Sequence, residues 1–224
     1  MIELGESVIV LDMDATLYLE ADFAVSGFNA LGSQFGDRFD GPRFVEDCTA
    51  SLYCGERGNI FNLALEAQGL EAEPQLIAQL ISAYRSHSPD IRLCDDSERF
   101  LTRTGNRQTG LVTDGPEVTQ ASKVRALNLS TRIDHIVLTD SLPQGFAKPH
   151  PRPFQEIEQL SGAPSSSHVY IADFGANDFL APNMLGWRTV QILLESRSHD
   201  GVPTTPDHRA QSTIVSLDEI SFTI

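Results

Sequence analysis

The stretch from Val8 to Thr16, VIVLDMDAT, constrains the fold of this chain more than any other. It begins with an apolar, mostly β-branched run, which predicts a strand buried on both faces of a parallel sheet. Asp12 and Asp14 follow this strand, at the edge of the sheet where ligands bind. The two carboxylates either cap the next helix or act on phosphate with Mg²⁺, one as a nucleophile and the other as an acid and base.

Helical patterns without a β-rich run fill about eighty residues after Thr16. Apolar residues recur at helical spacing in 59–69 and 74–87, and we expect a further helix over 24–39 in spite of its three glycines. From residue 96, helices alternate with apolar strands, which predicts a parallel sheet with helices on both faces. The expected helices cover residues 96–104, 117–127, 151–161 and 178–185, and the expected strands cover residues 108–113, 135–139, 168–172, 188–193 and, after a polar loop over 196–212, 213–217.

Polar residues also follow two of the other predicted strands. Thr113 and Asp114 end one of them, where free backbone N–H groups at a helix start would form an anion cradle; simple capping is the alternative. Asp173 ends another, and Asp178 lies five residues further on, so these two are either surface caps or oxygen ligands for a hard cation. Lys148 stands in a loop stiffened by prolines, which would present its ammonium group at a fixed place, although a lone lysine is usually solvated.

Taken in order, D-x-D-x-T, a strand that ends in Thr, a Lys before Pro, and D-x₄-D resemble the motifs of the haloacid dehalogenase (HAD) superfamily of phosphohydrolases. The resemblance covers nearly the whole chain, because the helical insertion is similar to the helical (type C1) cap of that superfamily. It implies an α/β fold with a Rossmann-like three-layer core around a parallel sheet, and an all-α cap inserted after the first strand. We expect residues 1–18 and 96–224 to form the core and residues 19–95 to form the cap.

The resemblance also implies a role for each matched residue. Asp12 would attack phosphorus and become an aspartyl phosphate, while Asp14 would protonate the leaving oxygen and then activate water. The groups that bind the phosphoryl oxygens would be Thr113, Asp114 and Lys148. The expected cofactor, Mg²⁺, would be held by Asp12, the backbone carbonyl of Asp14 and Asp173, with Asp178 reaching it directly or through water.

Three features refine this expectation. Ala15 and Ala172 stand where the family often has glycine, and we expect both small residues to be tolerated. Asp14 matters more, because dehalogenases of the superfamily lack this second acid, so the sequence favours phosphate esters over carbon–halogen bonds. Arg57, at the start of an expected cap helix, is a candidate substrate contact; the alternative is an exposed arginine.

The formal charge of −15 argues against nucleic acid and anionic membrane as partners. No targeting or membrane-spanning pattern is found, so a cytoplasmic protein is expected, and the three scattered cysteines lack the spacing of a zinc site. The sequence thus predicts a Mg²⁺-dependent phosphomonoesterase, monomeric or homodimeric, that hydrolyses a small phosphate ester such as a sugar phosphate or a nucleoside monophosphate. The alternatives are a phosphomutase of the same superfamily and a non-catalytic binding module on this scaffold.

Overall fold

The computed structural model describes residues 1–143, 145–173, 176–193 and 205–223. Its contacts divide the chain into two compact units, one of residues 1–20 with 92–224 and the other of residues 21–91. We call them the core unit and the helical unit. The greater part of the polar loop expected over 196–212 lies outside the described residues.

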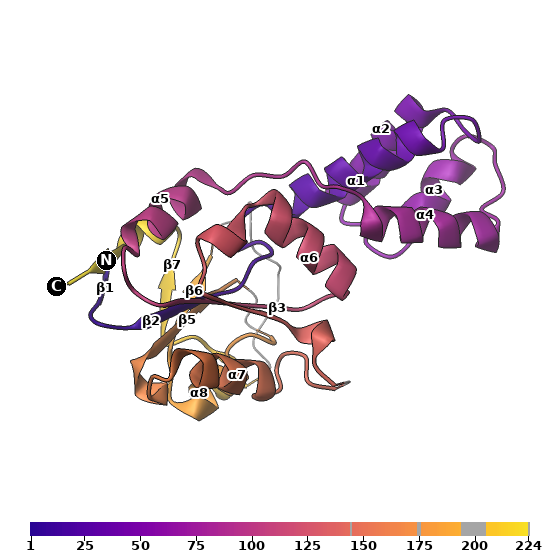
Figure 1. Ribbon diagram of the computed structural model, residues 1–224. Helices are drawn as coiled ribbons and strands as arrows, with labels where there is room; N and C mark the ends of the chain where they lie inside the picture. Colours follow the sequence, from indigo (N-terminus) through magenta and orange to yellow (C-terminus); the bar gives the residue numbers. More distant parts are fainter. Residues whose placement is uncertain (144, 174–175, 194–204, 224) are drawn as a thin grey trace. The chain divides into compact units, whose positions relative to one another are not determined.

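A six-stranded parallel sheet forms the centre of the core unit (Figure 1). The strand order is β4-β3-β2-β5-β6-β7, and every neighbouring pair is parallel. β2 lies between β3 and β5, and all four of its residues are buried, as its apolar run predicts. The strands span Val8–Leu11 (β2), Thr109–Thr113 (β3), His135–Leu138 (β4), His168–Ala172 (β5), Arg188–Ile192 (β6) and Ser212–Ile214 (β7).

Helices cover both faces of this sheet, with α5 and α6 on one face and α7 and α8 on the other (Figure 1). On the α7 face, the ring of Phe154 packs edge-on against the rings of Tyr170 and Trp187, with centroids 5.0 and 5.6 Å away. The expected α/β core with a parallel sheet between two helical layers is therefore confirmed. The helices span Asp95–Arg103 (α5), Glu117–Ala126 (α6), Arg152–Ser161 (α7) and Leu180–Leu185 (α8).

Two short elements of the core unit differ from the sequence prediction. The strands β1 (Ile2–Leu4) and β8 (Ile220–Phe222) pair in parallel as a second small sheet, which was not predicted because three residues carry too little pattern. The last strand of the large sheet, expected over 213–217, ends at Ile214. There the side chain of Ser216 accepts a hydrogen bond from Asp218 N and starts a short 3₁₀ helix.

The helical unit contains α1 (Glu20–Gln34), α2 (Gly41–Tyr53), α3 (Ile60–Glu66) and α4 (Pro74–Ser86). Helix α2 was not predicted; the side chain of Asp40 caps it by accepting a hydrogen bond of 3.1 Å from Arg43 N. The backbones of α1 and α2 meet at two glycines, since a Cβ on Gly41 would lie 2.2 Å from the carbonyl oxygen of Gly32. The glycines of α1 thus allow close packing and do not end the helix.

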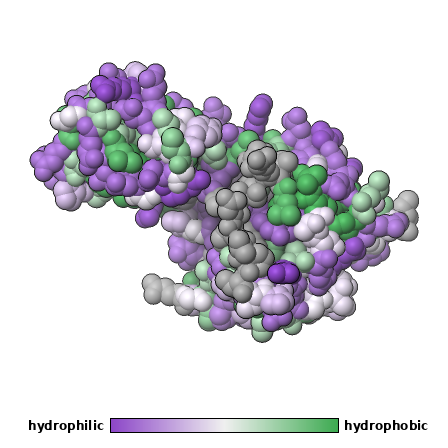
Figure 2. All heavy atoms as spheres, turned by 180° about the vertical axis from the view of Figure 1, so that it is seen from behind, coloured by the Kyte–Doolittle hydropathy of each residue, from purple (hydrophilic) through white to green (hydrophobic). Residues whose placement is uncertain are grey.

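Among the described residues, no helix combines the length and the apolar composition that crossing a membrane requires. Figure 2 shows hydrophilic side chains over much of the visible surface of both units, with hydrophobic side chains gathered in smaller areas. This distribution agrees with the acidic composition of the chain.

Candidate active site

A cavity of about 170 Å³ lies at the carboxyl edge of the sheet in the core unit. The central strand β2 and its neighbours β3 and β5 all end there, which is where parallel sheets bind ligands. Every site residue that the sequence predicted in the core lines this cavity. Its lining residues are Asp12, Asp14, Glu20, Thr113, Asp114, Lys148, Asp173, Asn177 and Asp178.

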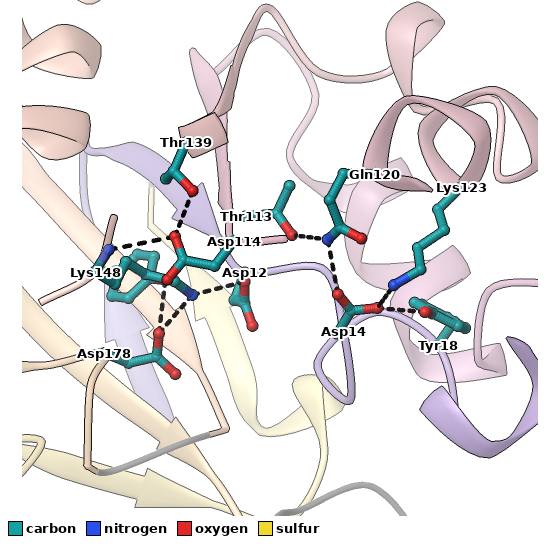
Figure 3. A network of polar contacts seen from close by, with 11 residues as sticks. Asp12, Asp14, Tyr18, Thr113, Asp114, Gln120, Lys123, Thr139, Lys148 and Asp178 are labelled. Carbon is teal, nitrogen blue, oxygen red and sulfur yellow. Dashed lines mark hydrogen bonds and ion pairs between the residues drawn. The ribbon is translucent and has the colours of Figure 1, made fainter. Parts of the chain in front are cut away.

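Lys148 lies at the centre of a buried ion-pair cluster (Figure 3). Its Nζ atom donates hydrogen bonds to Asp12 Oδ1 at 3.0 Å and to Asp178 Oδ1 at 2.7 Å. A further hydrogen bond of 3.3 Å runs from Nζ to the hydroxyl of Tyr170, which itself donates to Asp178. Lys148 is therefore held in one place, and the solvated alternative does not describe it.

Burial and neighbouring charges have opposing effects on the pKa values of Asp12 and Lys148. Burial raises the pKa of Asp12 well above its usual range; Lys148 opposes this rise, whereas Asp178 and the other nearby carboxylates add to it. Burial alone would lower the pKa of Lys148, but Asp12 and Asp178 outweigh it and raise that pKa well above the usual range. The lysine therefore stays charged at neutral pH, and an ionised Asp12 depends on it.

Asp114 orients the loop that carries Lys148. Its Oδ1 atom accepts hydrogen bonds from the hydroxyl of Thr139 at 2.6 Å and from the backbone N–H of Lys148 at 3.3 Å. A carboxylate repels phosphate, so the predicted part of Asp114 in phosphate binding falls to its backbone N–H rather than to its side chain. That part stays a prediction.

Asp14 belongs to a second cluster, which the sequence analysis did not find (Figure 3). Its Oδ1 atom accepts hydrogen bonds from Lys123 Nζ at 2.7 Å and from the hydroxyl of Tyr18, and its Oδ2 atom accepts one of 2.8 Å from Gln120 Nε2. Burial raises the pKa of Asp14, but the charge of Lys123 and these hydrogen bonds together outweigh it, so the pKa is lowered. Asp14 is thus held as a carboxylate.

A signal for this second cluster was present in the sequence. The chain contains two lysines, Lys123 and Lys148, and the side chains of both are buried against aspartates of the site. Gln120 and Lys123 are also three residues apart on the helix that follows Thr113, which places them on one face. Polar side chains on the buried face of a helix are typical of a functional site. The same holds for lysine, which occurs only twice in this chain and has its side chain buried both times.

We expect Lys123→Met to move the acid limb of the pH–rate profile upwards. Without the charge of Lys123, the effect of burial on the pKa of Asp14 is opposed less, so this pKa should rise and the carboxylate should be lost at a higher pH. The measurement is kcat against pH for an aryl phosphate, because the resemblance implies a phosphoenzyme that Asp14 hydrolyses as a base. Arg125→Met, which removes a charge from the exposed side of the same helix, is the control. Profiles that coincide for all three proteins would contradict the assignment.

The lowered pKa of Asp14 also has a consequence for stability. A carboxyl whose pKa is lower in the folded protein stabilises the fold above its unfolded pKa, and this contribution is lost as the pH falls through the folded value. Lys123→Met should therefore lose most stability at neutral pH and least in acid.

Asp173 and Asp178 complete a group of oxygen donors with Asp12. One carboxylate oxygen from each lies within 4.8 Å of the other two, and all three residues are buried. Helix α8 begins at Leu180, two residues later than expected, and Asp178 instead accepts the hydrogen bonds from Lys148 and Tyr170. Oxygen donors at this separation are the ligands that a hard cation prefers.

Two residues singled out from the sequence have structural explanations. Ala15 follows Asp14 with φ of 52° and is fully buried, so the backbone here adopts the left-handed conformation that favours glycine, and alanine is accommodated. The guanidinium of Arg57 donates hydrogen bonds to Leu52 O at 3.0 Å and Glu56 O at 2.8 Å, within the helical unit. Its contact with a substrate stays a prediction.

Comparison with known proteins identifies the family. The family model of the haloacid dehalogenase-like hydrolases matches residues 7–186. The chain belongs to the haloacid dehalogenase-like hydrolases. The family that the sequence resembles is thus confirmed, and the match spans all of the residues placed in the cavity.

Two relatives of this chain are named phosphatases, which supports a phosphatase within this family. The glyceraldehyde 3-phosphate phosphatase of Methanopyrus kandleri is 25% identical over 233 residues, which cover 95% of this chain and 97% of that protein. The enzyme of the same name from Pyrococcus furiosus is 25% identical over 133 residues, 58% of this chain and 55% of that protein. Among solved structures, the HAD-hydrolase YfnB from Bacillus subtilis bound to magnesium shares the fold, with a TM-score of 0.64 and 18% identity over 98% of this chain and 97% of that one.

Proposed function

We propose that this HAD-family hydrolase is a Mg²⁺-dependent phosphomonoesterase that acts on a small phosphate ester through an aspartyl phosphate on Asp12. One observation carries the proposal: Asp12 and Asp14 line one cavity, and the two carboxylates lie in opposite environments. Asp12 is paired with Lys148 among other acids, whereas Asp14 is surrounded by donors. Two carboxyl groups with separate environments are what a nucleophile and an acid–base residue require.

The charge of the cavity supports a divalent metal ion. Six carboxylates line it, and Lys148 is the single basic residue among its described lining residues. A phosphate ester is itself a dianion, so it would be repelled unless a cation offset part of this charge. Asp12, Asp173 and Asp178 would hold the ion, which fits their buried, oxygen-only donor set. When bound, Mg²⁺ supplies charge neutralisation of the transferring phosphoryl group.

The residues of the chain perform the two chemical steps. A carboxylate oxygen of Asp12 attacks phosphorus, the ester P–O bond breaks, and the leaving oxygen takes a proton from the fraction of Asp14 that is protonated, a fraction that the lowered pKa of Asp14 keeps small. Asp14 then accepts a proton from water as that water attacks phosphorus, which breaks the bond to Asp12 and releases inorganic phosphate. Lys148 and the hydroxyl of Thr113 stabilise the charge on the phosphoryl oxygens during both steps.

We also infer that the helical unit is the cap of this family and selects the substrate, with Arg57 as the candidate contact. The curated relatives are named for glyceraldehyde 3-phosphate, a three-carbon sugar phosphate, which belongs to the first of the two substrate classes expected from the sequence, sugar phosphates and nucleoside monophosphates. Small triose phosphates are therefore the substrates to test first.

The test is the release of inorganic phosphate from a panel of esters. We expect wild-type protein with Mg²⁺ to release phosphate from glyceraldehyde 3-phosphate or another small sugar phosphate, and from an aryl phosphate. A bisphosphate product with little free phosphate would instead identify a phosphomutase. No phosphate release from any ester, including the aryl phosphate, would identify a binding module and overturn the proposal.

Metal dependence is a separate expectation. Mg²⁺ should be required for turnover, and Ca²⁺ should bind but inhibit, because it is larger and tolerates less regular coordination. Both ions should raise the melting temperature of the metal-free protein, since each neutralises the buried acids of the folded state. Asp173→Asn should weaken this stabilisation, whereas Asp207→Asn, outside the cavity, should not. Full turnover in excess chelator would contradict the assignment.

A further inference from the structure

Gln120 hydrogen-bonds to both Asp14 and Thr113, two residues with separate roles in the proposed chemistry. The side-chain Nε2 atom lies 2.8 Å from Asp14 Oδ2 and 2.5 Å from Thr113 Oγ1. Gln120 is 1% exposed and comes from α6, so its amide is part of the wall behind the cavity rather than of the surface (Figure 3). No part of the proposed chemistry yet uses it.

The chemistry of these groups fixes the direction of each hydrogen bond. Asp14 is ion-paired with Lys123, so its carboxylate only accepts hydrogen bonds, and the amide of Gln120 must present its NH₂ group to it. The same nitrogen faces Thr113, and an amide nitrogen only donates. The oxygen of Thr113 must therefore accept from Gln120, and the hydroxyl hydrogen of Thr113 remains available in another direction.

That direction matters because Thr113 lines the cavity. The hydroxyl of Thr113 can donate its hydrogen either to a phosphoryl oxygen or to an acceptor of the protein. Only the hydrogen bond to the phosphoryl oxygen stabilises bound phosphate. With its lone pair engaged by Gln120, Thr113 is oriented as a donor towards a phosphoryl oxygen. The absence of a side chain at Gly115 leaves room for the Gln120 amide beside Thr113. Gly115 has φ of 128°, and a Cβ on it would lie 3.3 Å from Gln120 Cδ.

We propose that Gln120 is a positioning residue, which orients the Thr113 hydroxyl as a hydrogen-bond donor to the phosphoryl group and holds the Asp14 carboxylate beside it. The proposal rests on the proposed phosphatase function. It links the binding of phosphate to the placement of the acid–base residue, through one amide nitrogen. Among the described contacts, Gln120 reaches Asp14 through the side-chain carboxylate and not through the backbone carbonyl that is expected to bind the metal, and its other contact is with Thr113.

The test compares single and double variants in their binding of inorganic phosphate, measured by calorimetry with Mg²⁺ present. Thr113→Val removes the hydroxyl, and Gln120→Met removes the amide while keeping the length of the side chain. Each should raise the Kd of phosphate about ten- to a hundredfold, the loss expected for one hydrogen bond to a charged group. Because Gln120 acts through Thr113, the double variant should bind no more weakly than Thr113→Val alone.

Two controls separate positioning from a general effect on folding. Gln159→Met changes an exposed glutamine on α7 and should leave phosphate binding unchanged. Gln120→Glu preserves the shape of the side chain but places an acceptor against both partners, so it should fold and still lose more affinity than Gln120→Met. Circular dichroism and thermal unfolding identify any variant that fails to fold, and the uncharged Gln120→Leu then replaces Gln120→Met in the single and double variants.

The results distinguish this inference from the proposed function. Phosphate affinity in Gln120→Met equal to that of wild type, or losses that multiply in the double variant, would overturn the positioning role even if phosphate esters are hydrolysed. Conversely, coupled losses in binding without turnover of any ester would support the positioning of phosphate and overturn the phosphatase. A wild-type protein that binds no phosphate would overturn both.

Discussion

Asp12→Asn is expected to abolish turnover while making the metal-free protein more stable. A neutral amide cannot form the acyl phosphate, so kcat should fall by at least about 10⁴-fold with every ester. Burial and the neighbouring acids raise the pKa of Asp12, which means that its ionised form is disfavoured in the fold. A neutral side chain of the same shape removes this cost.

The sign of the stability effect can be followed with pH. Above the raised pKa of Asp12 the wild type holds this carboxyl ionised at a cost, so the melting temperature of Asp12→Asn should there be the higher of the two. As the pH falls through the raised pKa of Asp12, the wild-type carboxyl becomes protonated and the difference should shrink. Asp12→Ala, which cannot deamidate back to aspartate, is the control for residual activity. A less stable and fully active Asp12→Asn would contradict the nucleophile assignment.

Asp14→Asn should behave differently from Asp12→Asn. An aryl phosphate has a good leaving group and needs no acid, so the first step should survive while hydrolysis of the phosphoenzyme, which needs a base, slows. A burst of aryl product followed by a slow steady rate should then appear, with phosphoenzyme accumulating on Asp12. Equal loss in both variants without a burst would mean that Asp14 does not act as the base.

Lys148→Met is expected to have the second largest effect, on both turnover and stability. The variant leaves Asp12, Asp173 and Asp178 together without the ammonium that now bonds two of them. Removing one partner of a buried ion pair costs about 3–5 kcal/mol, which should appear in denaturant unfolding of the metal-free protein. Turnover should fall about 10²–10³-fold, as for the loss of one group that stabilises transition-state charge.

Two features sharpen this experiment. Arg152→Met breaks a partly exposed ion pair with Glu156, 3.0 Å long, and should cost at most about 1 kcal/mol with turnover retained. Since the chain contains two lysines, protein labelled with ¹⁵N-lysine carries two side-chain amine signals, and each lysine variant assigns one of them. Addition of Mg²⁺ should restore part of the lost stability of Lys148→Met. Wild-type turnover and stability in this variant would show that Lys148 has no part in the site.

The sequence by itself determined the layout of the core and most of the cavity. An apolar strand and the polar residue that follows it are local patterns, so Asp12, Thr113 and Asp173 could be placed at strand ends without coordinates. Parallel strands bring these ends to one edge of the sheet, and that is where the structure places them. The family resemblance assigned a chemical role to each of these residues, and it identified Lys148, in the proline-rich loop, as a site residue.

Only the tertiary structure decided which side chains meet. Gln120 and Lys123 lie 106 and 109 residues from Asp14 along the chain, and no local pattern connects them. They meet because β2 and β3 are neighbours in the sheet, so that the helix after β3 starts beside the loop after β2. The pairing of β1 with β8, at opposite ends of the chain, is likewise a contact between residues distant in sequence. Contacts between residues distant in sequence depend on how the elements pack, and packing is a property of the whole fold.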